Sequence, residues 1–196
     1  MSATVPSARR RPAVFFDRDG IVNRSPGPGY VERAEDFHLL PAFVAALRVV
    51  QRRGYAAIVV TNQRGVALGR VRPEALDEMH SRLRAALAAE GLQLLDIRVC
   101  TADHDADPRR KPNPGMLIEA AEVHALDLAR SWMIGDSERD IEAGRRAGCE
   151  VTVRVAPPSE ITAADLRVPD MDALPGLLEE RLPALAGQDF GRARRD

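Results

Sequence analysis

Short apolar runs alternate with longer amphipathic segments along most of the chain. The apolar runs predict strands at residues 13–16, 55–60, 95–100, 132–134 and 151–155. The amphipathic segments predict helices at residues 41–53, 73–90, 114–126, 138–147 and 175–182. Strands that alternate with helices in this way form a parallel sheet with helices on both faces. The pattern therefore predicts an α/β fold with a Rossmann-like sheet.

Composition supports a single globular domain. The chain has 196 residues, of which 45% are hydrophobic and 29% charged, and its net charge is −1. Such a balance gives no broad basic surface for nucleic acid or for an anionic membrane. The arginine clusters at residues 9–11 and 192–195 lie at the two ends of the chain. We expect flexible tails at residues 1–11 and 187–196 around one domain at residues 12–186.

Two cysteines and no long apolar run indicate a cytoplasmic protein. Cys100 and Cys149 are the only cysteines, which is too few for a secreted disulfide scaffold. No apolar run approaches the length of a membrane span. The arginines at residues 9–11 are not followed by the apolar segment of an export signal. We expect a cytoplasmic monomer.

Polar residues follow several of the predicted strands, at the sheet edge where α/β proteins bind ligands. Asp17 and Asp19 come directly after the first strand. One carboxylate can attack phosphorus and form a covalent acyl phosphate, while the other transfers protons to the leaving group and from water. We assign the attack to Asp17 and the proton transfer to Asp19. An isolated Asp-x-Asp-Gly is also typical of an acidic turn, so the assignment depends on the other strand ends.

Asp136 follows the fourth strand and brings a further carboxylate to this edge. Oxygen ligands around a phosphate are typical of a magnesium site. The metal would offset the repulsion between Asp17 and an anionic substrate. Asp140 lies one helical turn later and could hold a metal-bound water or a lysine. It could equally be a first-turn aspartate that stabilises the helix dipole.

Thr61, Asn62 and Lys111 supply the groups that a transferred phosphate needs. Thr61 and Asn62 follow the second strand and offer a hydroxyl, an amide and backbone N–H groups. Lys111 is the only lysine, although Lys and Arg together number 28. One lysine in a chain so rich in arginine indicates a place where a compact ammonium group is required.

Together these segments resemble the haloacid dehalogenase (HAD) superfamily of phosphatases. The four motifs are FFDRDG at residues 15–20, VVTNQ at 59–63, RKP at 110–112 and GDSERD at 135–140. The resemblance covers roughly residues 13–155, and the motifs occur in the expected order. It implies a HAD-like core and a magnesium-dependent phosphatase that acts through Asp17.

The motifs are most similar to the subfamily of heptose-bisphosphate 7-phosphatases and histidinol phosphatases. The similarity lies in residues 17–23, 29–31, 61–66 and 110–116. It implies that Asp17, Asp136 and the backbone carbonyl of Asp19 hold magnesium. The catalytic residues would then be Asp17, Asp19, Thr61 and Lys111. The candidate substrate-binding residues are Ser25, Gly29, Tyr30, Asn62, Gln63, Arg64, Arg110 and Ser137.

One departure from this subfamily concerns zinc. Its members usually carry a structural zinc loop with cysteine and histidine ligands before the Arg-Lys-Pro motif. Here Cys100 and His104 remain, but no second cysteine lies in the loop. Because a structural zinc site normally has four protein ligands, we expect no zinc.

The short segments between motifs leave no room for a large cap domain, so the loops around the site must set specificity. We expect a small phosphorylated substrate, with heptose 1,7-bisphosphate as the leading candidate and its C7 phosphate as the one removed. Histidinol phosphate is the main alternative. A polynucleotide 3′-phosphatase and a non-catalytic binding module with this fold are further alternatives.

Overall fold

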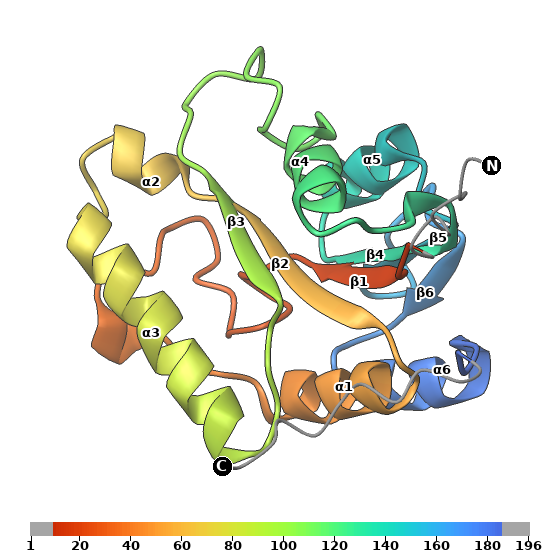
Figure 1. Cartoon of the computed structure of the whole chain (residues 1–196). Coiled ribbons are helices and arrows are strands. Elements are labelled where there is room, and N and C mark those ends of the chain that lie inside the picture. Colours follow the sequence, from red (N-terminus) through yellow and green to blue (C-terminus); the bar gives the residue numbers. More distant parts are fainter. Residues whose placement is uncertain (1–9, 186–196) are drawn as a thin grey trace, which may run out of the picture.

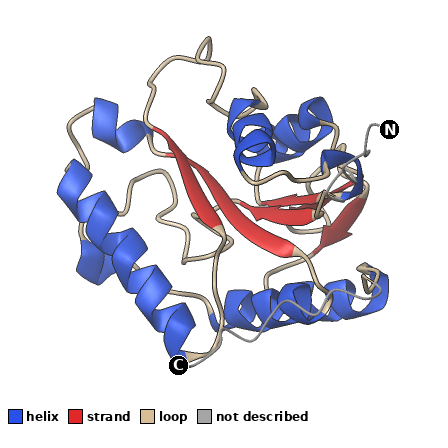
Figure 2. Ribbon diagram, in the orientation of Figure 1, coloured by secondary structure: helices blue, strands red, loops and turns tan. Residues whose placement is uncertain are grey.

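Six parallel strands form one sheet in the order β3-β2-β1-β4-β5-β6 (Figure 2). The computed structural model describes residues 10–185. The strands are β1 (Ala13–Phe16), β2 (Ala56–Asn62), β3 (Asp96–Cys100), β4 (Trp132–Gly135), β5 (Val151–Val155) and β6 (Leu166–Val168). This is the strand order of a doubly wound sheet, so the predicted α/β fold is confirmed.

Helices cover both faces of the sheet, with α1 and α6 on one side and α4 and α5 on the other (Figure 1). The helices are α1 (Pro41–Arg52), α2 (Arg64–Ala67), α3 (Pro73–Ala89), α4 (Gly115–Val123), α5 (Glu138–Ala147) and α6 (Leu174–Arg181). Two short 3-10 turns, η1 (Ala34–Asp36) and η2 (Leu128–Arg130), complete the elements.

Alternation along β1 explains why both faces need helices. Val14 and Phe16 belong to the core cluster that includes α1 and α6, whereas Phe15 belongs to the cluster that includes α4 and α5. Successive strand residues point to opposite faces. All three side chains are fully buried. Burial on both faces suits the interior position of β1, between β2 and β4. The buried strand in turn fixes the position of Asp17, the residue that follows it.

Several predicted bounds differ from the structure. The second strand runs on through Thr61 and Asn62, so both lie within β2 and not in a turn after it. The helix predicted at residues 114–126 ends at Val123 because Ala125 adopts a positive φ of 51°. β6 and α2 were not predicted, since each is only a few residues long and lacks a clear period.

Both predicted tails fall mostly outside the described residues. Residues 1–9 of the first and all of the second are not described. Arg11 is described, and it pairs with Leu126 in an isolated parallel bridge, so this residue joins the folded domain. Within residues 10–185, no helix is long and apolar enough to cross a membrane.

The sheet reverses its winding direction at β1, and the polar residues gather there. β2 lies on one side of β1 and β4 on the other, so the carboxyl ends of all three strands are adjacent. The strand order of an open α/β sheet places a crevice at this point. Asp17, Asn62 and Asp136 occupy the corresponding strand ends.

Candidate active site

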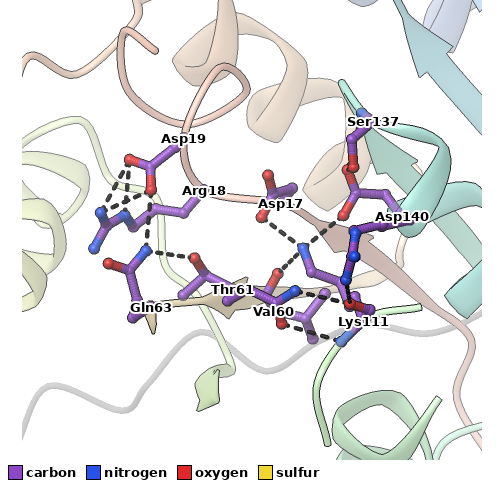
Figure 3. A network of polar contacts seen from close by, with 11 residues as sticks. Asp17, Arg18, Asp19, Val60, Thr61, Gln63, Lys111, Ser137 and Asp140 are labelled. Carbon is purple, nitrogen blue, oxygen red and sulfur yellow. Dashed lines mark hydrogen bonds and ion pairs between the residues drawn. The ribbon is translucent and has the colours of Figure 1, made fainter. Parts of the chain in front are cut away.

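A buried lysine ties together two of the acidic motifs. The Lys111 ammonium lies 2.6 Å from Oδ1 of Asp17 and 2.6 Å from Oδ1 of Asp140, and it donates to the Val60 carbonyl at 2.8 Å (Figure 3). Its side chain is only 2% exposed. A lysine has three N–H donors, and here each has an acceptor. Lys111 is therefore fixed beside Asp17 and cannot be exchanged for a broader guanidinium without moving the site.

Asn62 holds the backbone of this lysine. Its Nδ2 donates to the Lys111 carbonyl at 3.0 Å, and its Oδ1 accepts from the Lys111 N–H at 3.0 Å. The two bonds join the end of β2 to the loop before α4. Asn62 also lines the pocket described below, so it both faces the site and positions Lys111.

Burial and crowding raise the pKa of the acidic groups. Burial is the main cause that raises the pKa of Asp17 to about 7; the Lys111 ammonium opposes it, and Asp140 and Asp136 reinforce it. Burial and the Asp140 charge raise the pKa of Asp136 to about 6. For Lys111, burial favours the neutral amine, but Asp140 and Asp17 outweigh it and raise its pKa. The site thus crowds negative charge around one cation.

Three carboxylates are close enough to share a metal ion. Each of Asp17, Asp136 and Asp140 offers an oxygen, and these oxygens all lie within 4.8 Å of one another. A donor set made only of oxygens suits magnesium better than zinc, which favours nitrogen and sulfur. Asp140 is the least available of the three, because it is bonded to Lys111 and to both the backbone N–H and the hydroxyl of Ser137.

Two glycines allow the carboxylates to approach. A Cβ added to Gly20, which has a positive φ of 88°, would collide with the Asp136 carboxylate. A Cβ on Gly135 would collide with the side chain of Asp140. Each glycine therefore makes room for an acidic side chain that the site requires.

Asp19 points away from Asp17 and Lys111, as Figure 3 shows. Its carboxylate accepts from Arg18 at 2.9 Å, from Asn23 at 2.9 Å and from Gln63 at 3.0 Å. Gln63 also donates to the Thr61 hydroxyl at 2.8 Å. This network holds the Asp19 carboxylate apart from the nucleophile. Arg18 is fully buried, and sequence reasoning did not single it out because its neighbours carried the motif.

The pocket at this edge has a volume of about 260 Å³. Most of the predicted site residues line it. The lining comprises Asp17, Asp19, Ser25, Pro26, Gly27, Gly29, Tyr30, Thr61, Asn62, Lys111, Asp136, Ser137, Arg139 and Asp140. Three predicted substrate-binding residues, Gln63, Arg64 and Arg110, do not line it. Gln63 is buried and bonded within the site, so it supports Asp19 and does not face the pocket.

Arg139 lines the pocket but was not among the predicted site residues. It lies in the first turn of α5, between Ser137 and Asp140. Its position inside the fourth motif could have indicated this role, because residues in the first turn of a helix that begins beside a pocket can face that pocket.

Comparison with known proteins identifies the family. A family model described as "HAD-hyrolase-like" matches residues 108–156, which include Lys111 and Asp136. D-glycero-beta-D-manno-heptose-1,7-bisphosphate 7-phosphatase of Rhodopseudomonas palustris is 37% identical over 150 residues, covering 72% of this chain and 82% of that protein. The chain belongs to the heptose-bisphosphate phosphatase family of HAD-like hydrolases. A relative of the same name from Salmonella typhi is 32% identical over 187 residues, and the match covers 89% of this chain and 98% of that protein.

Solved structures of the family agree with this fold. One is D,D-heptose 1,7-bisphosphate phosphatase from B. bronchiseptica, complexed with magnesium and phosphate. It has a TM-score of 0.77 and 27% identity, and the match covers 86% of this chain and 98% of that chain. The chain is thus a HAD-type phosphoric monoester hydrolase, and the predicted enzyme class is confirmed.

Proposed function

We propose that this chain removes the C7 phosphate of D-glycero-D-manno-heptose 1,7-bisphosphate and transfers it first to Asp17. The observation that best supports this reaction is the buried Lys111, whose ammonium group contacts Oδ1 of Asp17 and Oδ1 of Asp140 beside the pocket. The proposed substrate is the one named for its 37% and 32% identical relatives.

Asp17 is placed to attack phosphorus. Lys111 holds Oδ1, whereas Oδ2 has no hydrogen-bond partner among residues 10–185 and is free to react. Lys111 also favours the ionised carboxylate, against the burial that raises its pKa. Asp17 and Asp136, together with the Asp19 carbonyl, would hold magnesium, which when bound offsets the charge of the phosphate and orients it.

Asp19 supplies the proton balance. As the bond between Asp17 and phosphorus forms, the bond from phosphorus to the C7 oxygen breaks, and Asp19 gives that oxygen a proton. Water then attacks the aspartyl phosphate, returns a proton to Asp19, and frees Asp17 and inorganic phosphate. Asp19 must first turn from Arg18 and Gln63 toward the pocket that it already lines.

The substrate is tested by kcat/KM for both anomers of the heptose bisphosphate against histidinol phosphate, with magnesium present. Phosphorus NMR identifies the phosphate that leaves. We expect a clear preference for a heptose bisphosphate, with the anomeric phosphate retained. A preference for histidinol phosphate, or loss of the anomeric phosphate first, would contradict the substrate but not the phosphatase activity.

Other expectations stay predictions. They are the absence of zinc, a monomeric and cytoplasmic enzyme, and no binding of nucleic acid or membrane. A polynucleotide 3′-phosphatase would need a basic groove with aromatic residues, and neither the net charge of −1 nor the pocket lining favours it.

A further inference from the structure

One carboxylate beside the pocket neutralises two arginines. Oδ1 and Oδ2 of Asp105 accept from Nη1 and Nη2 of Arg139 at 2.8 Å and 2.9 Å. Oδ1 also accepts from Nε of Arg110 at 3.1 Å. The bidentate contact with Arg139 is the geometry in which arginine also grips a phosphate. Asp105 therefore occupies the place that a phosphate group would take on this arginine.

The arginines are held in place without Asp105. Arg139 also donates to the Lys111 carbonyl at 3.2 Å, and Arg110 donates to the Ala102 carbonyl at 3.0 Å. The side chain of Arg110 is 11% exposed, whereas that of Asp105 is 61% exposed. Arg110 is thus held within the folded framework, whereas the side chain of Arg139, which is 46% exposed, and the Asp105 carboxylate are both open to solvent.

Asp105 can leave this position through a side-chain rotation alone. Nδ2 of Asn113 donates to the backbone carbonyls of Asp105 and Asp107 at 2.8 Å each, so the loop backbone stays fixed. The Asp105 carboxylate is 61% exposed, so water can take over its hydrogen bonds as it turns away from the arginines. The side chain can therefore be exchanged for another anion.

Charge favours that exchange. Arg110 and Arg139 carry two positive charges, and Asp105 returns one negative charge to them. The arginines hold the pKa of Asp105 well below its usual range, so it stays ionised at any pH at which the enzyme works. A phosphate with close to two negative charges would neutralise the pair more fully than a carboxylate does.

We propose that Asp105 is the internal counter-ion of a second phosphate site, and that the non-reacting phosphate of a bisphosphorylated sugar replaces it on Arg139 and Arg110. This inference rests on the proposed function. Arg139 lines the same pocket as Asp17, so one substrate reaches both. Arg110 and Arg64 do not line that pocket, but Arg110 shares the Asp105 carboxylate with Arg139 and so belongs to the same cluster of charges. Asp105 then weakens the binding of every anion that cannot grip both arginines, which makes it a determinant of specificity.

The test compares kcat/KM for heptose 1,7-bisphosphate with kcat/KM for heptose 7-phosphate, which lacks the second phosphate. We expect Arg139→Met to lower the ratio of the two values about tenfold, the usual effect of losing a hydrogen bond to a charged group. We expect Asp105→Asn to raise the ratio roughly threefold to tenfold, because a competing negative charge is removed.

Asp103 offers a matched control in the same loop. It is exposed and forms no ion pair with a described residue, so Asp103→Asn makes the same change of charge without touching the arginines. We expect it to leave the ratio unchanged. An equal rise in Asp103→Asn and Asp105→Asn, or ratios within about twofold of the wild type in all variants, would overturn the inference and leave the proposed function standing. A wild type that hydrolyses neither heptose phosphate would overturn both.

Discussion

Replacing Lys111 by methionine should destabilise the protein strongly, and more so as the pH rises. Lys111 is 2% exposed and contacts Asp17 and Asp140 at 2.6 Å each. Methionine has a similar length but leaves these carboxylates without their cation. Removing one partner of a buried ion pair costs about 3–5 kcal/mol. At about 2–4 °C per kcal/mol for a domain of this size, the Tm should fall by roughly 6–20 °C.

The sign of the pH dependence follows from Asp17. Its pKa in the folded protein is about 7 and rises further without Lys111, since burial then acts unopposed. A carboxyl whose folded pKa exceeds its unfolded value stabilises the fold at low pH, and this contribution is lost as the pH rises through the folded pKa. The loss of stability of Lys111→Met relative to the wild type should therefore be small near pH 5 and largest near pH 8.

The assay is thermal unfolding in EDTA at several pH values, which separates this effect from metal binding. Arg82→Met is the control, because it removes a cation from an exposed pair with Glu78, which contributes little. A Tm of Lys111→Met within about 2 °C of the wild type at pH 8, or a deficit that does not change with pH, would refute the reasoning.

Two further predictions concern the metal and the proton donor. Magnesium should raise the Tm of the wild type more than that of Asp136→Asn, and activity should be lost in EDTA. We expect no zinc, because Cys100 and His104 cannot complete a four-ligand site; about one zinc per chain in elemental analysis would contradict this. Asp19→Asn should slow single-turnover transfer from an alkyl phosphate by about 10²–10⁴-fold. It should slow the burst from p-nitrophenyl phosphate far less, because nitrophenolate leaves without a proton; equal losses on both substrates would argue against proton donation.

The sequence predicted the position of a site residue wherever that residue lies at the end of a predicted strand. Asp17, Thr61 and Asp136 gather as predicted because a parallel sheet aligns the carboxyl ends of its strands. Lys111 could be singled out as the only lysine, and the structure brings it to Asp17. In each case a period or a count in the sequence carried the spatial information.

The sequence was silent where function depends on side chains from separate loops. Gln63 reads as part of a phosphate motif, yet its side chain joins Asp19 to Thr61 inside the protein. The contact of Asp105 with Arg139 spans 34 positions and depends on how the loop before Lys111 folds back. No periodicity encodes such a contact, just as none marked the short strand β6.

The central claim is that the phosphate passes through Asp17. The most direct measurement is rapid quenching of the working enzyme, borohydride reduction of any acyl phosphate, and mass spectrometry of the peptide that contains this residue. An aspartyl phosphate would be reduced to the alcohol, so we predict homoserine at position 17, and only when both substrate and magnesium are present. An unmodified Asp17 under conditions of full turnover, or a modification at Asp19 or Asp136 instead, would contradict the account.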